Sequence, residues 1–120
     1  MAVPFASLAD EAAARAFFER RPDGWKLFRA IAEAVGEAGP VTITATKSRV
    51  CLLGRTRFLH CPQAHLDGHL FIRFLVPFRI QSPRLREDDM GGRWSYRVKL
   101  KELDDEAVAW FRAAYETDAL

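Results

Sequence analysis

The stretch Arg93-Trp-Ser-Tyr-Arg-Val-Lys-Leu-Lys101 decides the fold, because large apolar and charged side chains alternate along it. Such alternation is typical of a β-strand that buries one face and turns the other to water. Its rings and aliphatic side chains are predicted to face the core. Its four cations, together with Ser95, are predicted to share the opposite face, so that the strand carries a basic surface.

Four further segments upstream are short and strand-like, and turns separate them. They are predicted over residues 41–46, 49–53, 58–61 and 70–76. The links between them are short, which favours antiparallel hairpins. Residues 70–76 are apolar on both faces apart from Arg73, as expected of a central strand. Pro62 is expected to end the strand before it, because proline donates no ladder hydrogen bond.

Helical periodicity appears on both sides of these strands. Apolar residues recur at helical spacing over about residues 8–20, 25–35 and 105–115. Ser7 and Asp104 are the expected N-caps of the first and third helices. Pro22 to Gly24 should separate the first two helices, with Asp23 or Gly24 capping the second.

The resulting order, ααβββββα, predicts an α+β domain with an antiparallel sheet of about five strands and helices packed on one face. A length of 120 residues with 49% hydrophobic content suits a single domain over residues 1–120. Residues 77–92 contain two prolines and a Gly-Gly pair. They are predicted to form an irregular connection before the last strand.

Neither a membrane segment nor a secretion signal is predicted. The longest apolar run, residues 70–78, is interrupted by Arg73 and Pro77 and is far shorter than the ~20 residues of a spanning helix. The first residues lack an early Lys or Arg and a long apolar stretch. The two cysteines, Cys51 and Cys61, do not form a disulfide framework. Reduced thiols and a cytoplasmic location are therefore expected, with no membrane partner.

Charge is distributed unevenly along the chain. Residues 47–101 contain twelve basic and four acidic groups, a net charge of +8, although the whole chain has a net charge of only +2. Residues 102–120 contain one basic and six acidic groups, a net charge of −5. This asymmetry points to an anionic ligand or nucleic acid as the partner of the middle segment.

The leading candidate site is a basic sheet face with an adjoining loop. An open sheet with cations and an aromatic ring is one way in which domains bind single-stranded nucleic acid. The alternative is a solvated polar face on which long basic side chains cover apolar area. The predicted ligand-binding residues are Lys47, Arg73, Arg84, Arg93, Arg97 and Lys99.

The loop over residues 79–86 carries Arg84 and contributes two further arginines to this hypothesis. Arg79, Arg84 and Arg86 near Lys47 and Arg93 could clamp a carboxylate or phosphate group. The alternative is that these arginines pair internally with the acidic residues 87–89.

The three histidines are candidate metal ligands, because His60, His65 and His69 fall within ten residues, close to Cys61. Their spacing matches no closed zinc pattern, so the preferred interpretation is a loop with scattered polar groups, and no cofactor is expected. Cys51 and Cys61 are interpreted as small buried apolar residues rather than nucleophiles, since His60 and Cys61 point to opposite faces of a strand. The sequence contains no phosphate-binding loop, nucleotide fingerprint or serine elbow.

A set of landmarks occurs in order along the chain. They are Thr46-Lys47, Phe58, Leu70-Phe-Ile-Arg-Phe74, Arg79-Ile-Gln-Ser-Pro-Arg84, Arg93-Trp94, Leu103-Asp-Asp105 and Trp110-Phe-Arg-Ala-Ala-Tyr115. Together they resemble the bacterial family called domain of unknown function 5655, over roughly Ala16 to Tyr115. The resemblance implies a small α+β domain, found alone or appended to larger proteins, some of them called predicted transport proteins. It implies no particular activity, ligand or catalytic residue. The stretch from His60 to His69 departs from the family pattern, which weakens a family-wide metal site.

These observations favour a small non-enzymatic binding or accessory domain that takes an anionic ligand or nucleic acid. The first alternative is a protein-interaction or homodimerisation module that uses the outward apolar residues Phe71 and Leu75. The second alternative is a metal-dependent enzyme, which would require the histidines to hold an ion.

Overall fold

The computed structural model describes residues 3–89 and 93–118, and it contains three helices and one antiparallel sheet of six strands. The helices are α1 (Leu8–Phe17), α2 (Pro22–Gly36) and α3 (Asp105–Glu116). The strands are β1 (Thr42–Ala45), β2 (Val50–Leu53), β3 (Arg57–Ala64), β4 (Leu70–Val76), β5 (Arg86–Asp89) and β6 (Trp94–Leu100). The α+β architecture predicted from the sequence is confirmed, with one strand more than expected.

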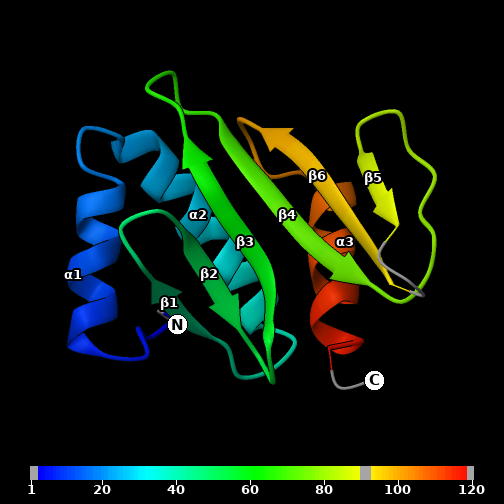
Figure 1. Ribbon diagram of the computed structural model, residues 1–120, viewed down its shortest axis with the longest axis horizontal. Coiled ribbons are helices and arrows are strands. Elements are labelled where there is room, and N and C mark those ends of the chain that lie inside the picture. The colour runs from blue at the N-terminus through cyan, green and yellow to red at the C-terminus, as the bar shows by residue number, and fades with distance from the viewer. Residues whose placement is uncertain (1–2, 90–92, 119–120) are drawn as a thin grey trace.

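The strands lie in the order β1-β2-β3-β4-β6-β5, and every neighbouring pair is antiparallel. β4 lies between β3 and β6, which confirms the central position predicted for a strand that is apolar on both faces apart from Arg73. Figure 1 views the sheet from its open side: α2 and α3 lie behind the strands, and α1 lies beside β1 at the edge. We call the side that faces this viewer the outer face.

The core lies between the sheet and the two helices behind it. Its largest fully buried side chains include Tyr96, Phe28, Phe58, Phe74 and Phe111. In β6 the alternation works as predicted, because Tyr96, Val98 and Leu100 are buried whereas Arg97 and Lys99 are exposed. Burial of such large side chains is the main favourable term in the folding of a domain of this size.

The helix ends follow the local sequence closely. The Ser7 side chain accepts a hydrogen bond from the Asp10 N–H, and Asp104 accepts one from the Ala107 N–H, so both predicted N-caps are confirmed. The cap predicted for the second helix is wrong. α2 begins at Pro22, because proline at the first helical position has no N–H to leave unpaired.

Two expectations about strand ends are also wrong. Pro62 does not end β3, which continues to Ala64 across a register shift between His60 and Gln63. A bulge of this kind accommodates a proline, because the ladder is already interrupted there. The stretch predicted to be an irregular connection contains β5, whose charged sequence Arg-Glu-Asp-Asp gives no strand signal and is typical of a protected sheet edge.

Ser95 points to the outer face as predicted, but it is only 1% exposed. Its cross-strand neighbours are Leu75 on β4 and Asp88 on β5. The unexpected edge strand therefore covers a position that would otherwise lie in water. Among the residues that the structure describes, no helix is both long and apolar enough to cross a membrane.

Candidate functional site

One row of side chains crosses the outer face of the whole sheet. The pairing register places each member directly opposite the next, in the order Thr44, Cys51, His60, Arg73, Arg97 and Arg86. Directly paired residues on antiparallel strands point to the same side of the sheet. We call the last four members, His60, Arg73, Arg97 and Arg86, the basic row. With strands spaced by about 4.8 Å, this row spans about 14 Å.

The basic row places like charges next to one another. Arg73 lies opposite Arg97, and Arg97 lies opposite Arg86. Within residues 3–89 and 93–118, only Arg97 of these three has an ion pair, with its Nε 3.4 Å from the Asp88 carboxylate. Like charges that lie directly opposite each other destabilise a sheet. Local conflicts of this kind are expected at functional or strained sites.

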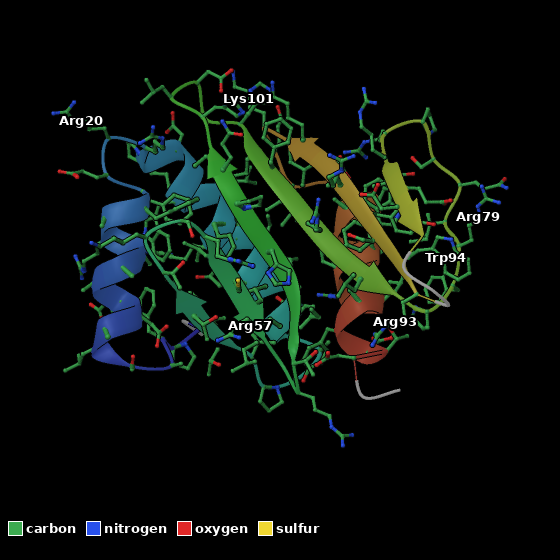
Figure 2. The ribbon with its side chains drawn as sticks, in the orientation of Figure 1. Arg20, Arg57, Arg79, Arg93, Trp94 and Lys101 are labelled. Carbon is green, nitrogen blue, oxygen red and sulfur yellow. The ribbon has the colours of Figure 1, made fainter. Side chains whose placement is uncertain are left out.

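Further cations flank the basic row on the same face. The Arg57 Nε donates to the Thr44 hydroxyl at 3.4 Å, and Arg57 and Arg49 line one hollow of about 450 Å³. On β6, Lys99 lies two residues beyond Arg97, and its Nζ is 5.7 Å from the centre of the Phe71 ring. Figure 2 shows Arg57 and Arg93 at the ends of their strands on the side nearest the viewer.

The structure brings together only part of the set predicted from the sequence. Arg73, Arg97 and Lys99 share the outer face, with Arg93 at the start of the same strand. Arg93 is half-buried, and its Nε has no hydrogen-bond partner in the described part of the chain. Lys47 is exposed in the turn between β1 and β2, at the rim of the face.

Arg84 lies apart from this face. Its guanidinium is 2.9 Å from Asp104 and 2.7 Å from Glu106, at the start of α3. It also lies 5.0 Å from the centre of the Trp110 ring. The hydrogen bond from Arg84 lowers the pKa of Asp104. These contacts fasten the loop to the helix, so Arg84 is placed for a structural role.

Of the other two loop arginines, Arg79 also has a structural partner. The Arg79 Nε is 3.2 Å from the Glu87 carboxylate. The same carboxylate accepts a hydrogen bond from the Tyr96 hydroxyl, with 2.8 Å between the two oxygens. Internal pairing of a loop arginine with residues 87–89 is therefore found for Arg79 and Glu87, whereas Asp88 pairs with Arg97 on β6 and Arg84 pairs at α3 instead. The side chain of Asp89 lies outside the described residues.

Sequence reasoning did not place four residues on the outer face. It left out Arg49 and Arg57, considered His60 only as a metal ligand, and considered Arg86 only as part of a loop clamp. Each is a cation or a protonatable ring in or beside a strand, so its residue type was visible. Their alignment follows from the strand order and the register, which hairpin lengths alone do not fix. Arg86 also depends on β5, which no sequence pattern indicated.

The His60 ring contacts Cys51 on the neighbouring strand, with 3.2 Å between Nδ1 and Sγ. Burial raises the pKa of the Cys51 thiol. The pKa of His60 is lowered mainly by burial and, second, by the positive charge of Arg49. Both groups are thus held neutral rather than as a thiolate–imidazolium pair, which argues against a nucleophile. Burial raises the pKa of Cys61 to about 12, in keeping with its interpretation as a small core residue.

The three histidines do not converge on one point. The His65 ring packs on Phe71 with ring centres 5.0 Å apart, and the His69 Nδ1 lies 2.9 Å from the Asp67 carboxylate. His60 lies on the outer face of β3. In the part of the chain that the structure describes, no group of three or more His, Cys, Asp or Glu residues is placed to hold a metal ion.

The residues predicted to form a dimer contact are partly covered. Phe71 and Leu75 are both half-buried on the outer face. His65 and Lys99 lie against the Phe71 ring. The apolar area that this face offers to a second copy is therefore small and surrounded by cations.

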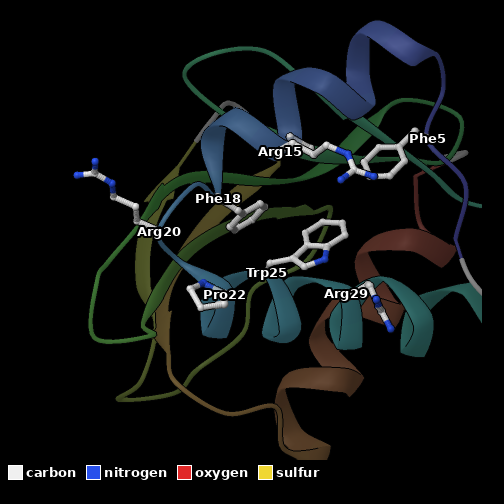
Figure 3. Close-up of a pocket in the computed structure, with 8 residues that line it drawn as sticks. Phe5, Arg15, Phe18, Arg20, Pro22, Trp25 and Arg29 are labelled. Atoms are coloured by element: carbon white, nitrogen blue, oxygen red, sulfur yellow. The ribbon is translucent and has the colours of Figure 1, made fainter.

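A different cavity, of about 470 Å³, lies between α1, α2 and the N-terminal segment. Phe5 and Trp25 stack in it with ring centres 6.0 Å apart (Figure 3). Two of the arginines at its rim already have partners, because Arg15 pairs with Glu11 and Arg29 with Glu33. In Figure 3 the Arg20 side chain points away from the rings. This cavity is apolar and lacks the convergent polar groups that orient a small ligand.

Comparison with known proteins gives one match. Neither a curated protein nor a solved structure matches the chain. A family model described as "Domain of unknown function (DUF5655)" matches residues 14–118. This match covers both helices behind the sheet, all six strands and every member of the basic row. The chain therefore belongs to the family described as domain of unknown function 5655.

Proposed function

We propose that this domain is a non-enzymatic binding module that holds single-stranded nucleic acid against its outer sheet face. The observation that carries the proposal is the basic row, in which Arg73, Arg97 and Arg86 face one another and, among the side chains that the structure describes, only the Asp88 carboxylate pairs with one of them. A strand of phosphates would supply the missing negative charge.

The shape of the surface favours a single strand over a small anion. The cations extend across four neighbouring strands rather than around one cavity, so they suit a ligand with repeated charges. Phe71 and His60 add rings to the same face, and rings provide stacking platforms for unpaired bases. Recognition through phosphates and stacking would be largely independent of sequence.

Fluorescence anisotropy with a labelled single strand of about ten nucleotides tests the proposal. If three arginines each neutralise one phosphate, the logarithm of the affinity should fall with the logarithm of salt with a slope of about −2. Raising the salt from about 50 to about 200 mM should then weaken binding by about twentyfold.

The matched variants are Arg73→Gln together with Arg97→Gln on the outer face, and Lys26→Gln on α2. Lys26 is exposed on a helix behind the sheet and carries the same charge. The outer-face variant should lose most of its affinity and flatten the salt dependence, whereas Lys26→Gln should do neither. An absence of binding at low salt, or an equal loss in both variants, contradicts the proposal.

Light scattering on the same samples tests the dimerisation alternative. A concentration-dependent dimer that Phe71→Ser abolishes would place a second copy of the chain, rather than nucleic acid, on this face. A monomer over the whole concentration range agrees with the proposed function.

A further inference from the structure

A groove of about 420 Å³ adjoins the basic row where β2, β3 and β4 lie side by side. Its lining residues are Ser48, Arg49, His60, Pro62 and Arg73. They come from the turn before β2 and from two neighbouring strands, and His60 lies directly opposite Arg73. The groove is therefore built by the pairing register of the sheet.

The groove is positively charged and lacks a carboxylate among its lining residues. Arg49 and Arg73 have no ion pair in the described part of the chain. The charged groups that act on His60 are Arg49 just before β2, Arg73 on β4 and Arg57 on β3. The Cys51 thiol contacts the His60 ring. All three charged neighbours are cations, so the charge of each one opposes protonation of the ring while the groove is empty, whereas a hydrogen bond with the Arg57 backbone favours it.

A bound anion would reverse this balance. A phosphate monoester carries a charge between about −1.5 and −2 at pH 7, whereas a phosphodiester inside a strand carries only about −1. Two arginines match the two charges of a monoester, and an imidazolium adds a third donor to its oxygens. The monoester is thus the phosphate that gains most from this particular set of groups.

We infer that this groove takes the terminal phosphate monoester of a nucleic acid strand, and that His60 takes up one proton from solvent when the phosphate binds. The inference rests on the proposed function, since it assigns one end of the bound strand to one end of the basic row. Arg49 and Arg73 hold the phosphate oxygens, and Ser48 provides a hydroxyl at the rim.

The test compares three otherwise identical single strands of about ten nucleotides: one with a 5′-phosphate, one with a 3′-phosphate and one with free hydroxyls at both ends. One of the phosphorylated strands should bind about tenfold more tightly than the unphosphorylated one near pH 6.5. This advantage should shrink to about threefold near pH 8, where the imidazole is neutral.

Two variants separate the groove from the general basic surface. His60→Gln keeps a polar side chain but cannot gain a charge, so the advantage of the phosphorylated strand should no longer fall between about pH 6.5 and about pH 8; any remaining change should be a small rise as the phosphate itself loses its last proton. Lys99→Gln removes a cation of the same face outside the groove. It should weaken all three strands alike and leave their ratio unchanged. Titration of the wild-type protein with inorganic phosphate, followed by the His60 ring resonances, reports the site without any nucleic acid.

The outcomes separate the two proposals. Equal affinity for all three strands at both pH values overturns the inference and leaves the proposed function standing. A shift of the His60 resonances with inorganic phosphate, without binding of any strand, supports the phosphate site and overturns the nucleic acid function. The absence of both signals overturns both.

Discussion

Arg73 on β4 and Arg97 on β6 lie directly opposite each other on the face of the sheet that no described helix covers. Among the residues that the structure describes, only Arg97 of the two has an ion pair, with Asp88 at 3.4 Å. Two cations in this position repel each other, and the repulsion is relieved when an anion lies across them. Removal of one of these two charges should therefore stabilise the fold and weaken the binding of an anion.

Replacing Arg73 by threonine should separate these two effects. Threonine suits a strand and removes one of the facing charges, so the free energy of unfolding should rise by about 0.5 kcal/mol. Affinity for a single-stranded oligonucleotide should fall in the same variant. Urea denaturation and anisotropy measure the two quantities. A variant that is both less stable and equally able to bind would show that the repulsion has no functional meaning.

Arg84→Gln should lower stability and leave the affinity for nucleic acid nearly unchanged. Arg84 bridges Asp104 and Glu106 and covers the Trp110 ring, but its side chain remains accessible to water, which screens the ion pairs. The variant should lose about 1 kcal/mol of stability. Its affinity for nucleic acid should remain within about twofold of the wild type, because the side chain lies away from the basic row. A large loss of affinity would show that Arg84 contributes to the binding surface after all.

The pH dependence of the free energy of unfolding should reveal that the His60 ring is partly buried. Burial holds the pKa of His60 in the folded protein below its ordinary value of 6.5. The unfolded chain then binds the proton more readily, so stability is fully present above about pH 6.5 and falls as the pH drops below it. Denaturation by urea at about pH 7.5 and about pH 5.5 measures the fall.

His60→Gln should lessen this fall, because the variant has no ring to protonate. His69→Gln is the matched control, because it removes an imidazole from the turn between β3 and β4, where the His69 Nδ1 lies 2.9 Å from the Asp67 carboxylate. Equal pH dependence in the wild type and in His60→Gln would show that other groups dominate.

The part of the fold that sequence predicted well is the part in which the local pattern agrees with the tertiary position. β6 alternates between core and water along most of its length, and Ser7 and Asp104 cap the helices that follow them. β5 was missed for the opposite reason. Its residues have low strand propensity, and the strand forms because β6 offers an unpaired edge and Tyr96 holds Glu87.

The candidate site was only partly predictable for a related reason. Alternation in one strand showed that Arg97 and Lys99 share a face, because this needs only the period of a strand. The alignment of His60 with Arg73 depends on pairing between separate strands, and Arg86 depends on an edge strand without a sequence signal. Arg84 looked equally suitable in sequence, but the start of α3 provides it with two carboxylates.

Asp118 should be essential for stability although it lies near the C-terminal end of the described chain. It is only 6% exposed, and one carboxylate oxygen accepts the backbone N–H groups of Arg55 at 2.6 Å and Thr56 at 2.8 Å. The Thr56 hydroxyl donates to the other oxygen. Asp118→Ala should lower the free energy of unfolding by about 2 kcal/mol, because it removes a charged, buried acceptor of three hydrogen bonds. Glu116→Ala, at an exposed position on α3, should change it little.

Tyr96→Phe should show whether the position of β5 matters for binding. The Tyr96 hydroxyl accepts the Ile80 N–H at 2.6 Å and donates to Glu87 at 2.8 Å, so it fastens the edge strand from the core side. Its loss should lower stability by about 1 kcal/mol and speed hydrogen exchange of the β5 amides.

The same change should weaken nucleic acid binding by about twofold, because Arg86 would no longer be held opposite Arg97. A double-mutant cycle with Arg86→Gln measures this connection. If Tyr96 acts through Arg86, then Arg86→Gln should reduce affinity less in the Tyr96→Phe background than in the wild type. Strictly additive effects would mean that Tyr96 does not act on binding through Arg86, and that β5 holds Arg86 in place without help from the Tyr96 hydroxyl.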